Sequence, residues 1–135
     1  DLPRIEVDEL GKPFFPDHPD IHFSLSHTAG AAAAALADTP VGVDIERVRP
    51  VSVRAMERIA GVRTEAAFFR SWVRREARVK RTGSGIVTMM RTEAPLNRGE
   101  FYYEVDAFHG YAAGVAAGQP EPPQPVHRLM LDQLL

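Results

Sequence analysis

Apolar and polar residues alternate along two neighbouring stretches in the first third of the chain. Residues 21–27 read IHFSLSH, with the apolar side chains on one face of a predicted strand and the polar ones on the other. Residues 40–50 read PVGVDIERVRP and predict a strand over 41–46, in which Asp44 and Glu46 share the face opposite the aliphatic residues. Further strands are predicted over 4–7, 86–91 and 110–117 and within 99–108.

The alanine run at residues 31–37 fits two structures. Alanine favours a helix intrinsically, whereas the position of the run between two predicted strands favours another strand. In the second case, a strand over 32–37 would form a hairpin with 41–46 through the residues DTP. The pattern leaves both structures open.

Two helices are predicted in the middle of the chain. A short helix over 51–61 has Ser52 as its candidate N-cap and Gly61 as its end. A longer helix covers 64–82, with Thr64 as its candidate N-cap and a glycine directly after its last turn.

Composition limits the class of protein. The chain has 135 residues, 44% of them hydrophobic, which is enough for one compact domain with a core. It has no cysteine, which excludes disulfides, thiolate metal sites and a cysteine nucleophile and is compatible with a reducing cytoplasm. No apolar run approaches the roughly 20 residues of a membrane-spanning helix, and the first residues lack the basic and apolar regions of a signal peptide. The formal net charge of −2 argues against general nucleic-acid binding.

Positive charge is concentrated in one segment of the chain. Residues 70–81, RSWVRREARVKR, carry six basic side chains and a single acid, Glu76. A helix of this composition is expected to attract phosphates or an acidic partner.

Asp44 and Glu46 place two like charges close together on one face of a strand. A divalent cation such as Mg²⁺ would offset their repulsion, whereas an ordinary half-exposed edge strand would leave them in solvent. On the long helix, Trp72, Glu76 and Lys80 share one face at the spacing i, i+4, i+8, and Trp72 is expected to pack into the core. If this helix packs beside the strand, Asp44, Glu46 and Glu76 form a three-carboxylate site for Mg²⁺. Otherwise Glu76 is a solvated ion-pair partner.

Four segments, in order, resemble a known family, the 4′-phosphopantetheinyl transferases of the Sfp type. They are GKPFFPDHPDIHFSLSHT (11–28), PVGVDIERVRP (40–50), FFRSWVRREARVKRTGSGI (68–86) and HGYAAGVAAG (109–118). The resemblance implies Mg²⁺-dependent transfer of the 4′-phosphopantetheine arm of coenzyme A to a serine of an acyl or peptidyl carrier protein, with release of 3′,5′-ADP. Together with the predicted elements, it implies an α+β fold in which an antiparallel sheet packs against one long helix.

The resemblance also assigns roles to single residues. Asp44, Glu46 and Glu76 match the acids that hold Mg²⁺ on the diphosphate of coenzyme A. Glu76 also matches the base for the serine proton, which it would accept directly or through a water. Lys80 matches the lysine beside the bridging phosphate oxygen, where it would neutralise the leaving ADP. Four further residues match contacts to coenzyme A, in a nucleotide-holding loop and at a strand end: Lys12, Pro13, Ser26 and His27.

The chain departs from the family pattern near its start. The first helix and first strand of the N-terminal half of the family's pseudo-dimer are missing, so that residues 1–39 match a remnant of that half and 40–120 match the C-terminal half. Residues 121–135 form a proline-rich extended tail outside this single domain of residues 1–120. Three accounts fit the departure: a fragment, a naturally short form that completes its site by self-association, or a relative that has lost turnover. Because the acids and Lys80 are retained, we favour the first two.

Three functions compete for this sequence. They are phosphopantetheinyl transfer, non-catalytic binding of coenzyme A or a carrier protein, and a different Mg²⁺ enzyme such as a phosphohydrolase or nuclease. The segments GKP and SH upstream of the acidic strand argue against the third. We therefore expect a cytoplasmic transferase that acts on coenzyme A and an acidic carrier protein, and that forms a homo-oligomer if the chain is naturally short. Neither nucleic acid nor a membrane is expected as a partner.

Overall fold

The computed structural model of the protein describes residues 2–130. The elements, in chain order, are β1 (Glu6–Val7), β2 (Pro13–Phe14), β3 (His22–Thr28), β4 (Ala31–Ala37), β5 (Gly42–Arg47), α1 (Val53–Ala60), α2 (Glu65–Thr82), α3 (Ile86–Arg91), β6 (Phe101–Val105) and β7 (Tyr111–Ala117). The expected fold class is confirmed to this extent: the protein is α+β, with antiparallel sheets packed against one long helix, α2.

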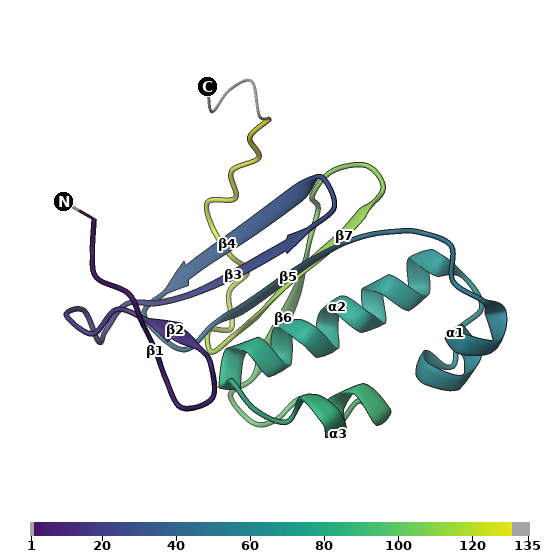
Figure 1. Ribbon diagram of the computed structural model, residues 1–135, viewed down its shortest axis with the longest axis horizontal. Coiled ribbons are helices and arrows are strands. Elements are labelled where there is room, and N and C mark those ends of the chain that lie inside the picture. The colour runs from purple at the N-terminus through teal and green to yellow at the C-terminus, as the bar shows by residue number, and fades with distance from the viewer. Residues whose placement is uncertain (1, 131–135) are drawn as a thin grey trace.

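The central sheet has the strand order β5-β7-β6, and both pairings are antiparallel. The helix α2 covers one face of this sheet, and the hairpin of β3 and β4 lies along the edge of β5 that β7 leaves free (Figure 1). The predicted strands in the last third of the chain are confirmed as β6 and β7. At the other end of the chain, only two residues of the predicted strand 4–7 pair, as β1, with β2.

The caps of both predicted helices are confirmed. The side chain of Ser52 accepts a hydrogen bond from the N–H of Ala55, and Gly61 ends α1 in the left-handed conformation. The side chain of Thr64 accepts from the N–H of Ala67 at the start of α2. No helix among residues 2–130 is both long enough and apolar enough to cross a membrane. The two helices pack around an apolar cluster that includes the predicted core tryptophan: Met56, Phe68, Phe69 and Trp72.

The strand β5 is buried on both faces. Residues 42–45 are all buried, because α2 packs on the side of Gly42 and Asp44 while the aliphatic residues pack on the other side. At Gly42, a Cβ atom would lie 2.0 Å from the carbonyl oxygen of Ala77, so the glycine lets the α2 backbone come this close. The alternative of a half-exposed edge strand is therefore wrong.

The alanine run forms the strand β4, but its partner differs from the predicted one. β4 pairs with β3 in an antiparallel register, and the two-residue turn Ala29–Gly30 joins them. Gly30 has a φ of 81°, a left-handed conformation that a glycine adopts without strain. The predicted hairpin with 41–46 is wrong, because side-chain hydroxyls of β3 bind N–H groups on that edge of β5.

Residues 86–91 form the helix α3 and not the predicted strand. Ile86 and Val87 are 51% and 64% exposed, so the segment has no buried pleated face of the kind that selects a strand. The Nη1 atom of Arg75 donates to the carbonyl oxygen of Met90 at 3.0 Å, which holds α3 against α2.

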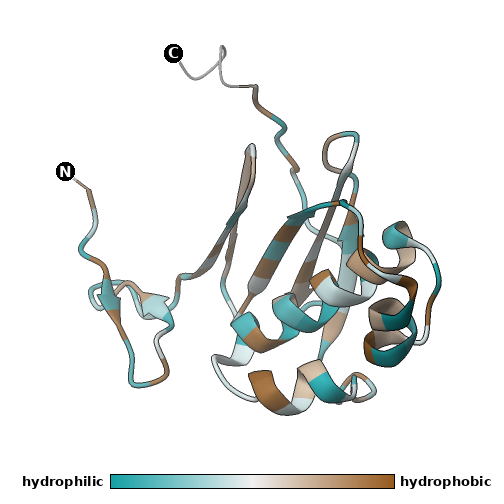
Figure 2. Ribbon diagram, turned by 45° about the vertical axis from the view of Figure 1, so that its right-hand side comes forward, coloured by the Kyte–Doolittle hydropathy of each residue, from teal (hydrophilic) through white to brown (hydrophobic). Residues whose placement is uncertain are grey.

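The proline-rich tail crosses the face of the sheet opposite α2. The side-chain amide of Gln119 donates to Oδ1 of Asp38 at 2.6 Å, and the Tyr103 hydroxyl donates to the carbonyl oxygen of Gln119 at 2.9 Å. From there, residues 121–130 run without helix or strand past the hairpin and the sheet, whose strands carry many hydrophobic residues (Figure 2). The end of the predicted tail, residues 131–135, lies outside the described residues.

Candidate active site

Asp44 is a carboxylate enclosed between β5 and α2, and only 3% of the residue is exposed. Its Oδ1 atom accepts hydrogen bonds from the Ser26 hydroxyl at 2.8 Å and from Lys80 Nζ at 3.1 Å. Burial raises the pKa of Asp44, although Lys80 and Ser26 act in the opposite direction. A carboxylate that is desolvated beside a specific charge partner is a candidate functional group.

Lys80 reaches this carboxylate from the last turn of α2. Its Nζ atom also lies 3.4 Å from the carbonyl oxygen of Leu25, so the ammonium group connects β3, β5 and α2. The lysine side chain is 31% exposed, which leaves part of its charge open to a ligand. The condition set for a three-carboxylate site, that the long helix packs beside the acidic strand, is met.

Glu76 lies one turn before Lys80 on the same face of α2. Burial raises the pKa of Glu76, Asp44 raises it further, Lys80 opposes this, and Glu46 adds to it. Glu46 itself is half-buried, and its Oε2 atom is 3.1 Å from Nη1 of Arg49. The three predicted acids therefore act on one another electrostatically across the contact between β5 and α2.

The donors of the predicted Mg²⁺ site are present, but they are not assembled as a closed group. Among residues 2–130, no three His, Asp or Glu side chains gather closely enough to hold a metal ion. Two features nevertheless fit a hard cation. Asp44 raises the pKa of Glu76, and Glu46 raises the pKa values of both. Oδ2 of Asp44 is also buried without a hydrogen-bond partner in the described part of the chain. Carboxylate oxygens are the ligands that Mg²⁺ takes, so the donor set fits this ion in its chemistry.

Lys12, which the resemblance assigns to coenzyme A, is bound within the protein. Its Nζ atom donates to the carbonyl oxygens of Val41 at 3.0 Å and Lys80 at 2.6 Å, and burial is the main cause that lowers its pKa. The lysine thereby ties the turn before β2 to the last turn of α2, where helix carbonyls lack intrahelical partners. Pro13 of β2 pairs with Val7 of β1, and His27 is exposed on β3.

Curated proteins with similar sequences share one activity in their names. The chain is 28% identical over 161 residues to 4'-phosphopantetheinyl transferase Sfp of Bacillus subtilis (strain 168), a match that covers 98% of this chain and 70% of that protein. It is 37% identical over 93 residues to 4'-phosphopantetheinyl transferase psf-1 of Bacillus pumilus, covering 60% of this chain and 40% of psf-1. It is 33% identical over 110 residues to 4'-phosphopantetheinyl transferase AcpT of Salmonella typhi, covering 70% of this chain and 57% of AcpT. No family model matches the chain. The chain belongs to the 4′-phosphopantetheinyl transferase family, Sfp type.

This chain of the 4′-phosphopantetheinyl transferase family spans only part of the length of the relatives that it matches. It spans 70% of the length of Sfp, 57% of AcpT and 40% of psf-1. The match with Sfp extends over 161 positions, although this chain has 135 residues, so Sfp carries residues inside the matched region that this chain lacks.

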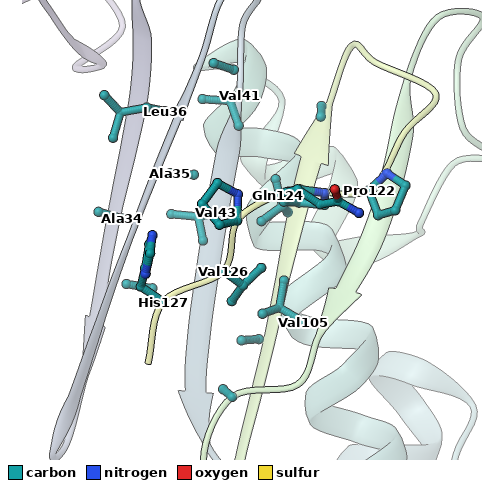
Figure 3. Close-up of a pocket in the computed structure, with 18 of the residues that line it drawn as sticks. Ala34, Ala35, Leu36, Val41, Val43, Val105, Pro122, Gln124, Val126 and His127 are labelled. Carbon is teal, nitrogen blue, oxygen red and sulfur yellow. The ribbon is translucent and has the colours of Figure 1, made fainter. Parts of the chain in front are cut away.

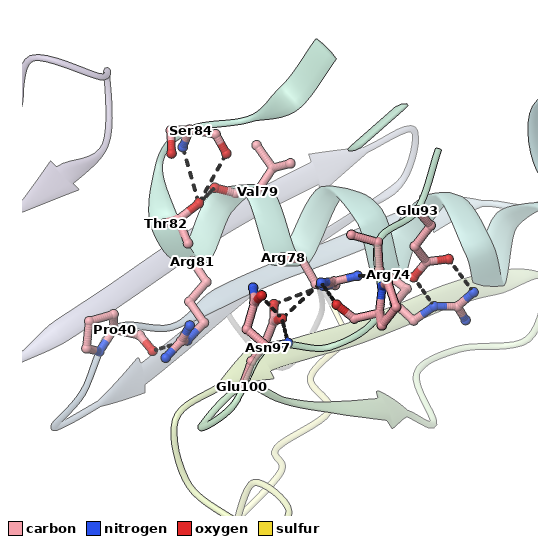
Figure 4. A network of polar contacts seen from close by, with 12 residues as sticks. Pro40, Arg74, Arg78, Val79, Arg81, Thr82, Ser84, Glu93, Asn97 and Glu100 are labelled. Carbon is pink, nitrogen blue, oxygen red and sulfur yellow. Dashed lines mark hydrogen bonds and ion pairs between the residues drawn. The ribbon is translucent and has the colours of Figure 1, made fainter. Parts of the chain in front are cut away.

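In this 4′-phosphopantetheinyl transferase relative, several arginine side chains of the basic helix α2 bind groups of the protein itself. Arg75 and Arg78 are only 5% and 2% exposed. Two nitrogens of Arg74 bind Glu93 at 2.5 and 2.7 Å, and two nitrogens of Arg78 bind Glu100, both at 2.9 Å (Figure 4). The expectation that the whole basic segment attracts phosphates or an acidic partner is wrong for these three arginines, because the segments packed against α2 bind their guanidinium groups.

Sequence reasoning missed the way the hydroxyl groups of β3 are used. The Oγ atoms of Ser24 and Ser26 accept the N–H groups of Val43 and Ile45 at 3.0 and 3.1 Å. The two serines are 4% and 6% exposed, whereas Leu25 between them is 56% exposed, so the polar face of this strand is the buried one. The available signal was the recurrence of hydroxyl residues at every second position of FSLSHT.

A cavity of about 760 Å³ lies on the other side of β5 (Figure 3). Alanines of β4, valines of β5 and β7, and residues of the tail such as Pro122 and Val126 line it. Because Val43 and Asp44 point to opposite faces of the strand, the sheet separates this cavity from the acids. The cavity is therefore an apolar space beneath the tail, and the candidate active site is the contact between β5 and α2.

Proposed function

We propose that this chain transfers the 4′-phosphopantetheine arm of coenzyme A to a serine of an acyl or peptidyl carrier protein. The serine oxygen forms a bond to the phosphorus that carries pantetheine. The bond from that phosphorus to the bridging oxygen breaks, 3′,5′-ADP leaves, and the serine proton passes to a base. The names of the curated relatives support this reaction.

The observation that carries the proposal is the meeting of β5 and α2 at Asp44, Lys80 and Glu76. The Lys80 ammonium lies 3.1 Å from Oδ1 of Asp44, and Glu76 is close enough for Asp44 to raise its pKa. The family resemblance gives only the order of these residues along the chain. The contact between α2 and β5 brings them close together in space, as a reaction centre requires.

Asp44, Glu46 and Glu76 would hold Mg²⁺ in this proposal. When bound, the ion supplies positive charge that stabilises the phosphate oxygens as negative charge builds on them.

Glu76 and Lys80 supply the proton and charge chemistry of the protein itself. The raised pKa of Glu76 favours acceptance of the serine proton, directly or through a water, because a base works best with a pKa near the operating pH. Lys80, one third exposed, offers a cation to the leaving ADP. We assign contacts with coenzyme A to the exposed His27 and to the loop that Lys12 and Pro13 anchor, as the resemblance implies.

A second candidate is a non-catalytic protein that binds coenzyme A or a carrier. It is favoured by the absence of an assembled metal group among residues 2–130 and by the use of Lys80 as the partner of Asp44. Self-association of the short chain, the division into 1–39 and 40–120, and a cytoplasmic location stay predictions.

The test is incubation of the chain with coenzyme A, Mg²⁺ and an apo carrier protein, followed by mass spectrometry of the carrier. We expect a mass gain of one phosphopantetheine. Asp44→Ala and Glu76→Ala should lower the rate by about 100-fold or more, with an unchanged circular dichroism spectrum. Glu121→Ala, at an exposed residue of the tail, is the matched control and should leave the rate unchanged. Binding of coenzyme A without any mass gain would favour the second candidate.

A further inference from the structure

Side-chain hydroxyls replace a backbone ladder between β3 and β5. In the described part of the chain, β3 forms ladder bonds with β4, and β5 forms them with β7. Across the gap between β3 and β5, the Oγ atoms of Ser24 and Ser26 accept N–H groups of β5 at 3.0 and 3.1 Å, and Thr28 Oγ1 accepts a third at 3.4 Å. The hydroxyl residues of β3 are therefore the joint between the hairpin and the central sheet.

Two of these hydroxyls also donate to the acids of β5. Ser26 Oγ donates to Oδ1 of Asp44 at 2.8 Å, and Thr28 Oγ1 donates to Oε2 of Glu46 at a longer 3.5 Å. Ser24 lies at the corresponding position beside Gly42, which has no side chain to receive a bond. A hydroxyl has one proton to donate, so the proton of Ser26 is used by Asp44.

The bond from Ser26 fixes which oxygen of Asp44 is left open. Oδ1 receives both Ser26 and Lys80, whereas Oδ2 is buried and has no hydrogen-bond partner among residues 2–130. A carboxylate held by two donors on one oxygen cannot turn without breaking both bonds. Groups that orient a metal-binding carboxylate in this way tune its affinity for the ion.

We propose that Ser26 is a positioning residue that holds Asp44 with Oδ2 free for a divalent cation, and that it is not a donor to a phosphate of coenzyme A. The proposal rests on the proposed function for the identity of the cation. It differs from the contact with coenzyme A that the family resemblance assigns to this serine. Ser26 is only 6% exposed, and its hydroxyl already donates to Asp44.

The test compares Ser26→Ala with Ser24→Ala and Ser26→Thr. Ser26→Ala and Ser24→Ala each remove one hydroxyl from the joint, so each should accelerate hydrogen exchange of one amide, that of Ile45 or Val43. Only Ser26→Ala should weaken binding of Mg²⁺ to the chain in isothermal titration calorimetry, by about 10-fold or more. Ser26→Thr keeps the hydroxyl and should restore the affinity to within about threefold of the original chain. An unchanged Mg²⁺ affinity in Ser26→Ala, or an equal loss in Ser24→Ala, would overturn the proposal.

Two further measurements separate the positioning role from the proposed function. Without divalent cations, the affinity for 3′,5′-ADP should be the same in Ser26→Ala and in the original chain, and a selective loss would show a phosphate donor instead. If the original chain binds no Mg²⁺, the metal role in the proposed function fails, and the ¹³Cγ chemical shift of Asp44 at fixed pH decides the positioning role. A change of that shift in Ser26→Ala but not in Ser24→Ala supports it, and no change in Ser26→Ala refutes it.

Discussion

The charged residues of α2 form two sets that face different neighbours. Arg74 and Arg78 face the segment after α3, where each binds a glutamate through two nitrogens. Glu76 and Lys80 alternate with them along the sequence but face β5, where Lys80 meets Asp44. Because residues four apart share one face of a helix, the sets interleave along the chain and separate in space. Stability and candidate chemistry can therefore be tested on different residues of one helix.

Arg78→Met should remove the cation beside the Glu100 carboxylate, whose side chain is 3% exposed. Breaking a buried ion pair from one side typically costs about 3–5 kcal/mol, because the remaining charge stays buried. We expect a loss of that size in the free energy of unfolding, measured by urea denaturation. Arg70→Met, at an exposed position of the same helix, is the control and should change it by less than about 0.5 kcal/mol. A loss below about 1 kcal/mol for Arg78→Met would contradict a stabilising role for the pair.

Glu76→Gln should stabilise the protein at neutral pH in the absence of divalent cations. Burial and the neighbouring Asp44 raise the pKa of Glu76, so the folded state disfavours the ionised carboxylate. The contribution of Glu76 to stability is then complete below the ordinary glutamate pKa of about 4.3, and it is lost as the pH rises through the raised pKa. The gain in stability from Glu76→Gln should thus be absent at low pH. It should grow as the pH rises through the raised pKa and level off above it. Melting curves between pH 4 and pH 8 check this, and an equal shift at all pH values would show another cause.

Close approach of α2 and β5 depends on a residue without a side chain. The carbonyl oxygen of Ala77 and the amide nitrogen of Arg81 would lie 2.0 and 2.4 Å from a Cβ atom at Gly42. Both are backbone atoms, which cannot turn away as a side chain can. The same contact brings Lys80 to Asp44, so one glycine governs both the packing and the candidate site.

Gly42→Ala should therefore destabilise the protein by about 3 kcal/mol or more, since a clash with backbone forces the helix off the sheet. Gly99→Ala is the matched control: beyond its chain neighbours, nothing lies within 4 Å of its added Cβ, and only the cost of its positive φ applies, about 1–2 kcal/mol. Urea denaturation of both variants measures the difference. Equal losses in the two would mean that α2 has room to move away from β5.

Most elements of this fold could be predicted from the sequence, whereas their partners could not. Caps such as Ser52 and Thr64 act within one turn, so local sequence suffices to place both helices. The partner of β4 depends on which edge of β5 is free, and buried hydroxyls of β3 occupy that edge. The segment at 86–91 has strand-favouring residues, but its conformation depends on contacts with α2.

The candidate site shows the same division between local and long-range information. Motif order identified Asp44, Glu76 and Lys80, and the structure brings the strand and the helix together at these residues. The internal use of Lys12 and Ser26 could not be predicted, because each binds groups that lie far away in the sequence.

On the scale of the whole molecule, the two faces of the central sheet are covered in different ways. The helix α2 seals one face with direct backbone contact at Gly42. On the other face, aliphatic residues of β5 and β7 form a cluster with alanines of β4, and the tail crosses over it, leaving the cavity of about 760 Å³ (Figure 3). The tail lines this cavity together with the loop after β6 (residues 106–108), and its contribution to stability can be measured by removing it.

Removal of residues 120–135 should lower stability without unfolding the protein. Gln119 stays in place, so its bonds to Asp38 and Tyr103 persist. The cover over the valine cluster is lost, together with the hydrogen bond from Arg128 Nε to the carbonyl oxygen of Asp106. Most tail residues are exposed, so the apolar area that they bury is modest, and we expect a loss of about 1–2 kcal/mol in the free energy of unfolding. The exposed cluster should also bind the dye ANS more strongly than in the full chain. In the full chain, Val126→Asp places a charge at the cavity wall and should cause a smaller loss of the same kind. If truncation changes neither the unfolding curve nor the dye fluorescence, the apolar face is protected without the tail, and the hairpin of β3 and β4 with the loop at 106–108 must cover it.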